Sequence, residues 1–201
     1  MIYGSEAFQK LITDYEFSTV LDIGSGSGEA SIEFLNLGKK VTMVDILPQA
    51  EKTKHKNCIY RQRFFKDVRF NDTFGCVWCC QVLEHQLNVN KFLTKVFQCL
   101  KENGILCITV PPGKNEIVGG HVTIWNAGLL LYNLILAGFD CSNAIFKKYG
   151  YNISVILEKK EARLPNNLSF DKGDIEKLSE FFPSFVNGNF DGNLSDWNWD
   201  V

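Results

Sequence analysis

Apolar and polar residues follow two alternating patterns along the chain, one typical of strands and the other of helices. Short apolar runs, as in strands buried on both faces, occur at residues 19–23, 41–44, 58–62, 75–80 and 105–110. Segments with apolar residues at helical spacing occur at residues 7–12, 29–37, 89–100 and 126–137. This alternation predicts an α/β fold, with a sheet of parallel strands and helices on both faces.

The pattern changes after residue 137. Two strand-like segments, residues 142–148 and 152–158, are separated only by the turn-like residues 149–151. A connection this short joins antiparallel strands, because a parallel crossover needs a dozen or more residues. We therefore expect a mostly parallel sheet that ends in one antiparallel hairpin.

Residues 161–201 are interpreted as an extension of the domain formed by residues 1–160, since about 40 residues rarely build a core of their own. The extension is rich in aromatic residues, which disordered segments usually lack: Phe170, Phe181, Phe182, Phe185, Phe190, Trp197 and Trp199. We expect it to dock on the main domain. Alternatively, the two tryptophans could cover a cleft or form an oligomer contact.

Composition limits the class of protein. The formal net charge of −2 argues against broad nucleic-acid binding, which depends on excess Lys and Arg. No apolar stretch reaches the roughly 20 residues of a membrane span, and residues 1–10 lack the pattern of a secretion signal. We expect a cytoplasmic protein.

The seven cysteines are an odd number and lie mostly in predicted strands. This distribution favours a reducing compartment over a disulfide framework. Cys76 and Cys79 would point to opposite faces of their strand, so we expect no metal site there.

The most informative segment is Leu-Asp-Ile-Gly-Ser-Gly-Ser-Gly at residues 21–28. Its three glycines permit a sharp turn after the strand and let a ligand lie against the backbone. The following helix directs its free N–H groups at the same place. Dinucleotide enzymes usually space these glycines as Gly-x-Gly-x-x-Gly, whereas Gly-x-Gly-x-Gly suits a compact charged group. Asp22 would orient the cationic end of such a ligand.

Asp45 ends the second predicted strand, 21 residues after Gly24. An acid at this place can accept hydrogen bonds from both hydroxyls of a ribose. Together, the glycine segment and Asp45 predict a cofactor that contains adenosine.

These motifs, with the 73–78 run and Val-Leu-Glu-His at 82–85, resemble those of the class I S-adenosylmethionine-dependent methyltransferases. The resemblance covers about residues 19–158 and is greatest to small-molecule enzymes such as the ubiquinone-precursor methyltransferases. It implies a Rossmann-like, seven-stranded sheet, with S-adenosylmethionine as cofactor and S-adenosylhomocysteine as product.

The resemblance also implies which residues contact the cofactor: Asp22, Gly24, Ser25, Gly26, Gly28, Asp45, Ile46, Asp67, Val68, Cys80 and Gln81. Asp67 and Val68 would lie by the adenine, and Cys80 and Gln81 by the methionine part. The chain departs from the family at Gly75, where an Asp is common, and in its short link from Asp67 to the fourth strand.

Residues 110–126, 138–141 and 149–154 are similar to bacterial methyltransferases of surface-polysaccharide modification. This likeness implies a role in polysaccharide biosynthesis. The acceptor would be a sugar, or a phosphate-type group attached to one.

Methyl transfer to a hydroxyl requires alignment and removal of a proton, for which histidine is the natural base. His85 follows the fourth strand and His121 follows the fifth, at the edge where open α/β sheets bind ligands. Either could instead be structural. We expect His55, which lies among lysines, to be on the surface and to take no part. We predict an O-methyltransferase with a small-molecule or glycan-linked acceptor. A nicotinamide-dependent (NAD) oxidoreductase and a non-catalytic scaffold protein are the alternatives, and the oligomeric state stays open.

Overall fold

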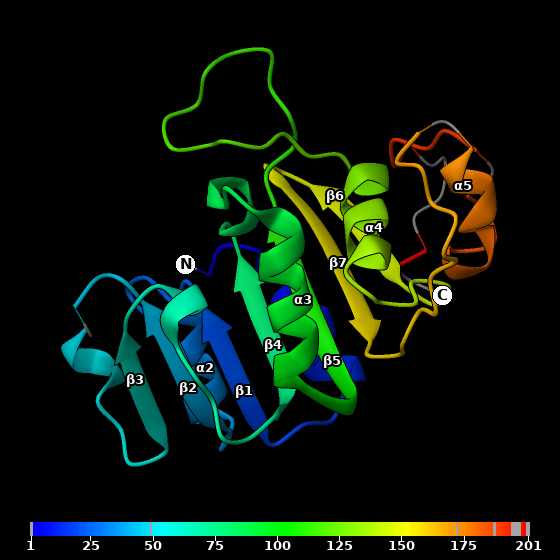
Figure 1. Ribbon diagram of the computed structural model, residues 1–201. Coiled ribbons are helices and arrows are strands. Elements are labelled where there is room, and N and C mark those ends of the chain that lie inside the picture. Colours follow the sequence, from blue (N-terminus) through cyan, green and yellow to red (C-terminus); the bar gives the residue numbers. More distant parts are fainter. Residues whose placement is uncertain (1, 49, 172, 187, 194–197, 200–201) are drawn as a thin grey trace.

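The computed structural model describes residues 2–48, 50–171, 173–186, 188–193 and 198–199 (Figure 1). Seven strands in the described part of the chain form one sheet in the order β3-β2-β1-β4-β5-β7-β6. They are β1 (Thr19–Ile23), β2 (Lys40–Asp45), β3 (Cys58–Gln62), β4 (Phe74–Cys80), β5 (Leu100–Val110), β6 (Ile145–Tyr149) and β7 (Asn152–Glu158). β1 to β5 pair in parallel, and β7 runs antiparallel to β5 and β6. The predicted Rossmann-like fold with a terminal hairpin is confirmed.

Helices cover both faces of the sheet. The α-helices are α1 (Ser5–Asp14), α2 (Glu29–Asn36), α3 (Val89–Cys99), α4 (Ala127–Leu136) and α5 (Asp174–Lys177), and the short 3-10 helices are η1 (Glu51–Thr53), η2 (Phe65–Asp67), η3 (Leu83–His85) and η4 (Ser179–Phe181). One apolar core lies between α1, α2 and the sheet, and a second lies between α3, α4 and the opposite face. Cys76 packs in the first core and Cys79 in the second, so their side chains diverge as predicted.

The order of the strands places a crevice at one edge of the sheet. The chain proceeds outward from β1 through β2 to β3 on one side, and through β4 and β5 on the other. Open α/β sheets bind ligands at such a reversal, outside the carboxyl ends of the strands. Here those ends are Ile23, Asp45 and Cys80.

β5 corrects the sequence prediction. The pattern predicts a helix over residues 89–100 and a strand from Ile105, but the helix ends at Cys99 and the strand begins at Leu100. Asn103 adopts a left-handed backbone (φ 58°), and the pairing with β4 shifts between Phe74 and Cys76. Such an irregularity cannot be read from apolar spacing.

β6 also begins later than predicted, at Ile145 instead of residue 142. The Ala144 amide bonds to the Cys141 carbonyl, which closes a turn before the strand.

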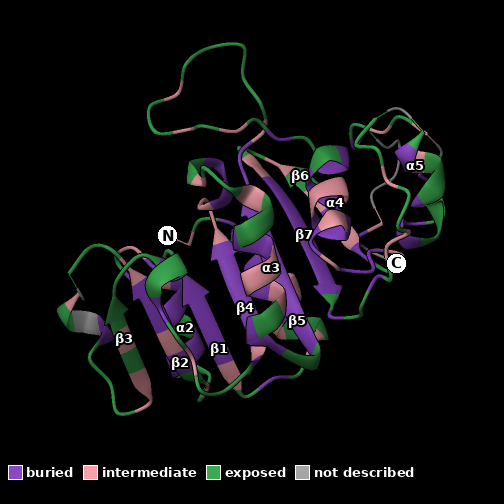
Figure 2. Cartoon of the chain, in the orientation of Figure 1, coloured by how far each residue is buried: buried purple, intermediate pink, exposed green. Residues whose placement is uncertain are grey.

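Residues beyond 160 pack against α4 and β6. The Ala127 amide bonds to the Asp191 carbonyl, and the Phe146 amide donates to Asn198 Oδ1. Phe181, Phe182 and Trp199 are buried, whereas the β3 edge and the loop before α4 are largely exposed (Figure 2). Trp197 lies outside the described residues, and the division into a domain and an extension stays a prediction. No helix in the described ranges combines the length and apolar character that a membrane crossing requires.

Candidate functional site

The glycine segment forms a left-handed turn between β1 and α2. Gly24, Gly26 and Gly28 have φ values of 71°, 51° and 83°. A Cβ at Gly24 would lie 2.2 Å from Val82 Cγ2, and one at Gly28 would lie 2.2 Å from Thr53 Cγ2. The turn therefore requires glycine for both its backbone conformation and its close packing.

Ser25 carries unused hydrogen-bonding capacity within this turn. Ser25 is 9% exposed, and its hydroxyl oxygen is buried with no hydrogen-bond partner in the described part of the chain. Buried polar atoms are normally paired, so an orphaned hydroxyl at the start of α2 is compatible with a polar ligand.

Asp22 is almost fully buried below the turn, where Ser31 Oγ donates to its Oδ2 at 2.5 Å. Burial raises the pKa of Asp22 to about 7, against the Ser31 hydrogen bond, and the negative charge of Asp45 acts in the same direction as burial. A cation placed beside this carboxyl would favour its ionised form.

Asp45 closes the other side of the crevice. Its Oδ2 accepts from the Gly26 amide at 2.7 Å and its Oδ1 from the Leu47 amide at 2.8 Å. Each carboxylate oxygen has a second lone pair, so Asp45 retains capacity for two ligand hydroxyls. Ile46, which follows it, exposes an apolar side chain (55% exposed) beside this carboxylate.

Asp67 and Val68 differ in what they can offer. Asp67 is exposed at the end of η2. Val68 is buried in the core, its amide bonds to the Phe65 carbonyl, and its carbonyl accepts from Lys95 Nζ at 2.6 Å. Of this pair, only Asp67 has a side chain available to a ligand.

Gln81 links the end of β4 to the terminal hairpin. It adopts a left-handed backbone (φ 58°), its amide bonds to the Thr109 carbonyl, and its Nε2 donates to Asn152 Oδ1 at 3.0 Å. Strained non-glycine residues of this kind often occur at functional sites. Cys80 beside it is half-buried, and burial raises the pKa of its thiol to about 12, so the thiol stays protonated.

The structure brings His85 and His121 together, with ring centroids 5.1 Å apart in an edge-to-face arrangement. His85 Nδ1 lies 2.7 Å from the Gly120 carbonyl oxygen. Because a carbonyl only accepts, Nδ1 carries the proton, and Nε2 of the neutral ring has a free lone pair. His55 is exposed in the turn before β3.

Burial lowers the pKa of His121, and positive charge on His85 and Lys114 lowers it further. The neutral form of the His121 ring is therefore favoured.

Glu84 belongs to the motif at residues 82–85, but the sequence pattern assigns it no role at the site. Its side chain is 1% exposed, neither carboxylate oxygen has a hydrogen-bond partner among the described residues, and its Oε1 lies 3.7 Å from His85 Nε2. Burial raises the pKa of Glu84, although a positive charge on His85 would lower it. The Leu-Glu-His sequence gives no sign of this burial, since an acid at a helix start is usually exposed.

Glu84, His85 and His121 could together hold a metal ion, since their donor atoms all lie within 4.8 Å of one another. A carboxylate and two imidazoles suit a divalent transition metal. Neighbouring donors around a tetrahedral ion are only about 3.3 Å apart, so binding would draw the three side chains together. The absence of a metal, which we expect from the sequence, stays a prediction.

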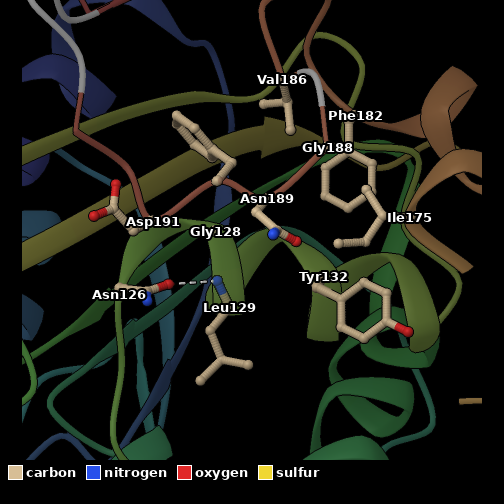
Figure 3. A pocket seen from close by; sticks show the side chains of 11 residues that line it. Asn126, Gly128, Leu129, Tyr132, Ile175, Phe182, Val186, Gly188, Asn189 and Asp191 are labelled. Carbon is tan, nitrogen blue, oxygen red and sulfur yellow. Dashed lines mark hydrogen bonds between the residues drawn. The ribbon is translucent and has the colours of Figure 1, made fainter. Parts of the chain in front are cut away.

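A cavity of about 600 Å³, distinct from the crevice at the carboxyl ends of the strands, lies between α4 and the C-terminal residues. Side chains from α4 and those of Ile175, Phe182, Val186 and Asn189 line it (Figure 3). Gly128 approaches this segment so closely that a Cβ would lie 1.6 Å from the Phe190 carbonyl oxygen. The residues that line this cavity are separate from the glycine turn and the histidine pair.

Comparison with known proteins identifies the family. Residues 5–128 match the family described as a methyltransferase domain. The chain belongs to this methyltransferase family. The family resemblance predicted from residues 21–28, 44–45 and 82–85 is thereby confirmed.

Curated relatives match part of the chain. The ubiquinone biosynthesis O-methyltransferase of Glaesserella parasuis is 34% identical over 103 residues, which cover 45% of this chain and 44% of the relative. The mitochondrial enzyme of Schizosaccharomyces pombe is 31% identical over 100 residues, or 45% and 36% of the two chains. The matches thus span less than half of the length of either relative.

Solved methyltransferase structures share the fold. The 1,6-didemethyltoxoflavin-N1-methyltransferase of Burkholderia thailandensis, with bound S-adenosylhomocysteine, aligns with a TM-score of 0.67 at 19% identity and covers 78% of this chain and 77% of that one. The N-methyltransferase NodS of Bradyrhizobium japonicum WM9, also with S-adenosylhomocysteine, gives 0.65 at 14% identity, covering 78% and 85%. These likenesses extend to the architecture of the sheet and its helices.

Proposed function

We propose that this chain is an S-adenosylmethionine-dependent methyltransferase that O-methylates a small-molecule or glycan-linked acceptor in the cytoplasm. The observation that carries the proposal is the glycine turn, with the orphaned Ser25 hydroxyl on one side and the accepting Asp45 carboxylate on the other. Membership of the methyltransferase family supports it.

The proposed cofactor residues are distributed along this crevice. Asp22 would pair with the ammonium group, the three glycines would admit the methionine part next to Cys80 and Gln81, and Asp45 would accept from the ribose hydroxyls. Ile46, Asp67 and Val68 would border the adenine, with Val68 set back in the core. When bound, S-adenosylmethionine supplies a methyl group on a positively charged sulfur.

His85 is the proposed base. Its free Nε2 would accept the proton of an acceptor hydroxyl as the oxygen forms its bond to the methyl carbon and the carbon–sulfur bond breaks. The hydrogen bond from Nδ1 to Gly120 would hold the ring in the required tautomer. His121 would position the acceptor from the opposite loop.

The proposed acceptor class has two sources of support. The curated relatives are O-methyltransferases that act in ubiquinone biosynthesis. The likeness of residues 110–126 to polysaccharide-modifying enzymes favours a sugar or a sugar phosphate, and so a role in surface-polysaccharide biosynthesis.

Methyl transfer from S-adenosylmethionine labelled in the methyl group tests the proposal directly. We expect label in sugars or sugar phosphates from a mixed panel that also contains catechols. His85→Gln should lower kcat by about 10²- to 10⁴-fold, the usual loss for a general base, while His55→Gln should leave it unchanged.

Label only in catechols would contradict the glycan part of the proposal. Full turnover in His85→Gln would remove His85 as the base. A rate that falls on dialysis against EDTA and returns with zinc would mean that the reaction depends on a metal ion, for which Glu84, His85 and His121 are the candidate ligands.

A further inference from the structure

A cavity of about 230 Å³ lies under the loop between β5 and α4, which projects from the carboxyl edge of the sheet (Figure 1). Two of its lining residues contact the proposed reaction site. His121, which lines it, contacts the His85 ring, and the carbonyl of Tyr151, another lining residue, accepts weakly from Gln81 Nε2 at 3.5 Å. A molecule in this cavity would therefore lie next to both the histidine pair and the end of β4.

Trp125 gives the cavity an unused hydrogen-bond donor. It lines the cavity and is 3% exposed, and its Nε1 has no acceptor among the residues that the structure describes. An indole N–H can only donate, and buried donors are normally paired. A ligand oxygen that reached this N–H would satisfy it.

Lys114 supplies a positive charge to the same cavity. Its Nζ lies 4.9 Å from the centroid of the Tyr151 ring and 3.4 Å from Glu116 Oε1. The Glu116 side chain is 67% exposed, and exposed ion pairs of this kind contribute little. A ligand anion could displace Glu116 from Lys114 at small cost.

Glu116 and His121 also line the cavity. The rest of the lining is mostly apolar, from Pro111, Pro112, Val118, Val122 and Ile124. The cavity thus combines two hydrogen-bond donors with apolar walls.

We propose that this cavity binds the acceptor through an acidic group, a carboxylate or a phosphate, whose oxygens receive hydrogen bonds from Trp125 Nε1 and Lys114 Nζ. The hydroxyl to be methylated then lies on the side of His121 and His85. Calling this ligand the acceptor rests on the proposed function, whereas the preference for an acid rests on the cavity alone.

Matched pairs of acidic and neutral compounds test the inference. The full chain, saturated with S-adenosylhomocysteine, is titrated calorimetrically with 4-hydroxybenzoate against 4-hydroxybenzyl alcohol, and with glucose 6-phosphate against glucose. In at least one pair the acid should bind about tenfold more tightly than its neutral partner, since charged hydrogen bonds are the stronger ones. The pair that responds distinguishes a carboxylate from a phosphate.

Variants assign the effect to the cavity. Lys114→Met should weaken binding of the acid about tenfold, and Trp125→Phe, which removes the N–H and keeps an aromatic ring, by several fold. Lys101→Met is the control, because this exposed lysine lies near the start of β5, at the opposite edge of the sheet. Thermal stabilisation by S-adenosylhomocysteine in each variant reports that the fold and the cofactor site are intact.

Equal affinity for acid and neutral partner, no binding of either acid, or an unchanged affinity in Lys114→Met would overturn the inference. If S-adenosylhomocysteine does not stabilise the wild type, the proposed function fails. The titrations with acidic and neutral compounds, repeated without S-adenosylhomocysteine, still test whether the cavity prefers an acid.

Discussion

Two aspartates at neighbouring strand ends differ in their electrostatic environment. Asp45 is held by two backbone amides at the open edge, whereas Asp22 is buried with one hydroxyl partner. The pKa of Asp22 is raised above that of an aspartate in the unfolded chain. Asp22 therefore contributes stability at low pH that is lost as the pH rises toward about 7. A ligand ammonium group would reverse this preference, because it favours the ionised carboxylate.

This reversal predicts that the affinity for S-adenosylhomocysteine depends on pH. If S-adenosylhomocysteine binds the ionised form of Asp22, a pKa of about 7 makes its dissociation constant about tenfold smaller at pH 8 than at pH 6. Calorimetric titration at the two pH values measures the ratio. Asp22→Asn should show weak binding with no such dependence, and a wild-type ratio near one would contradict the role of Asp22.

At the scale of elements, the turn from β1 to α2 packs closely against the segment after β4 at Gly24. A Cβ at Gly24 meets Val82 Cγ2, whereas a Cβ at Gly26 meets nothing within 4 Å, although both residues have positive φ. The backbone strain of a left-handed residue, about 1–2 kcal/mol, is common to both positions. The contact with the segment after β4 belongs to Gly24 alone.

Gly24→Ala should therefore destabilise the protein more than Gly26→Ala does, by about 1–3 kcal/mol beyond the shared strain. Denaturant unfolding measures the difference. Adding Val82→Ala should recover part of the loss in Gly24→Ala but not in Gly26→Ala. Equal losses in the two single variants would show that the contact does not matter.

Sequence patterns locate these elements where each forms from local signals. Residues 19–23 and 58–62 are predicted as strands and found with the same bounds as β1 and β3. The start of β5 is missed because the pairing of Leu100 with Phe74 is followed by a register shift, within which Asn103 takes a left-handed conformation. Apolar spacing carries no information about such a shift in register.

At the scale of the molecule, one part of the candidate site can be predicted from local sequence and another part cannot. The glycine turn and Asp45 are neighbours through adjacent strands, so motif and topology suffice to predict them. The approach of His121 to His85, the burial of Glu84 and the unpaired Trp125 N–H depend on how the loop before α4 folds back on η3. These long-range contacts have no local sequence signature.

Attachment of the C-terminal residues is also a property of the whole molecule. Gly128 in α4 faces the Phe190 carbonyl, and a Cβ there would lie 1.6 Å from that oxygen. Gly128→Ala should displace the segment and speed its cleavage in limited proteolysis, while stabilisation by S-adenosylhomocysteine persists. Gly173→Ala, which meets nothing within 4 Å, is the control. Unchanged proteolysis of Gly128→Ala would contradict docking at this place.

The most direct test of the central claim is thermal unfolding with S-adenosylmethionine, S-adenosylhomocysteine and NAD, each added alone. A ligand at a hundred times its dissociation constant stabilises the folded state by about 2.7 kcal/mol. We predict this response to the two sulfur compounds only, largely lost in Asp45→Ala and kept in Asp72→Ala, whose aspartate is exposed. Stabilisation by NAD alone would contradict the account in favour of an oxidoreductase, and no response to any of the three would favour a scaffold protein.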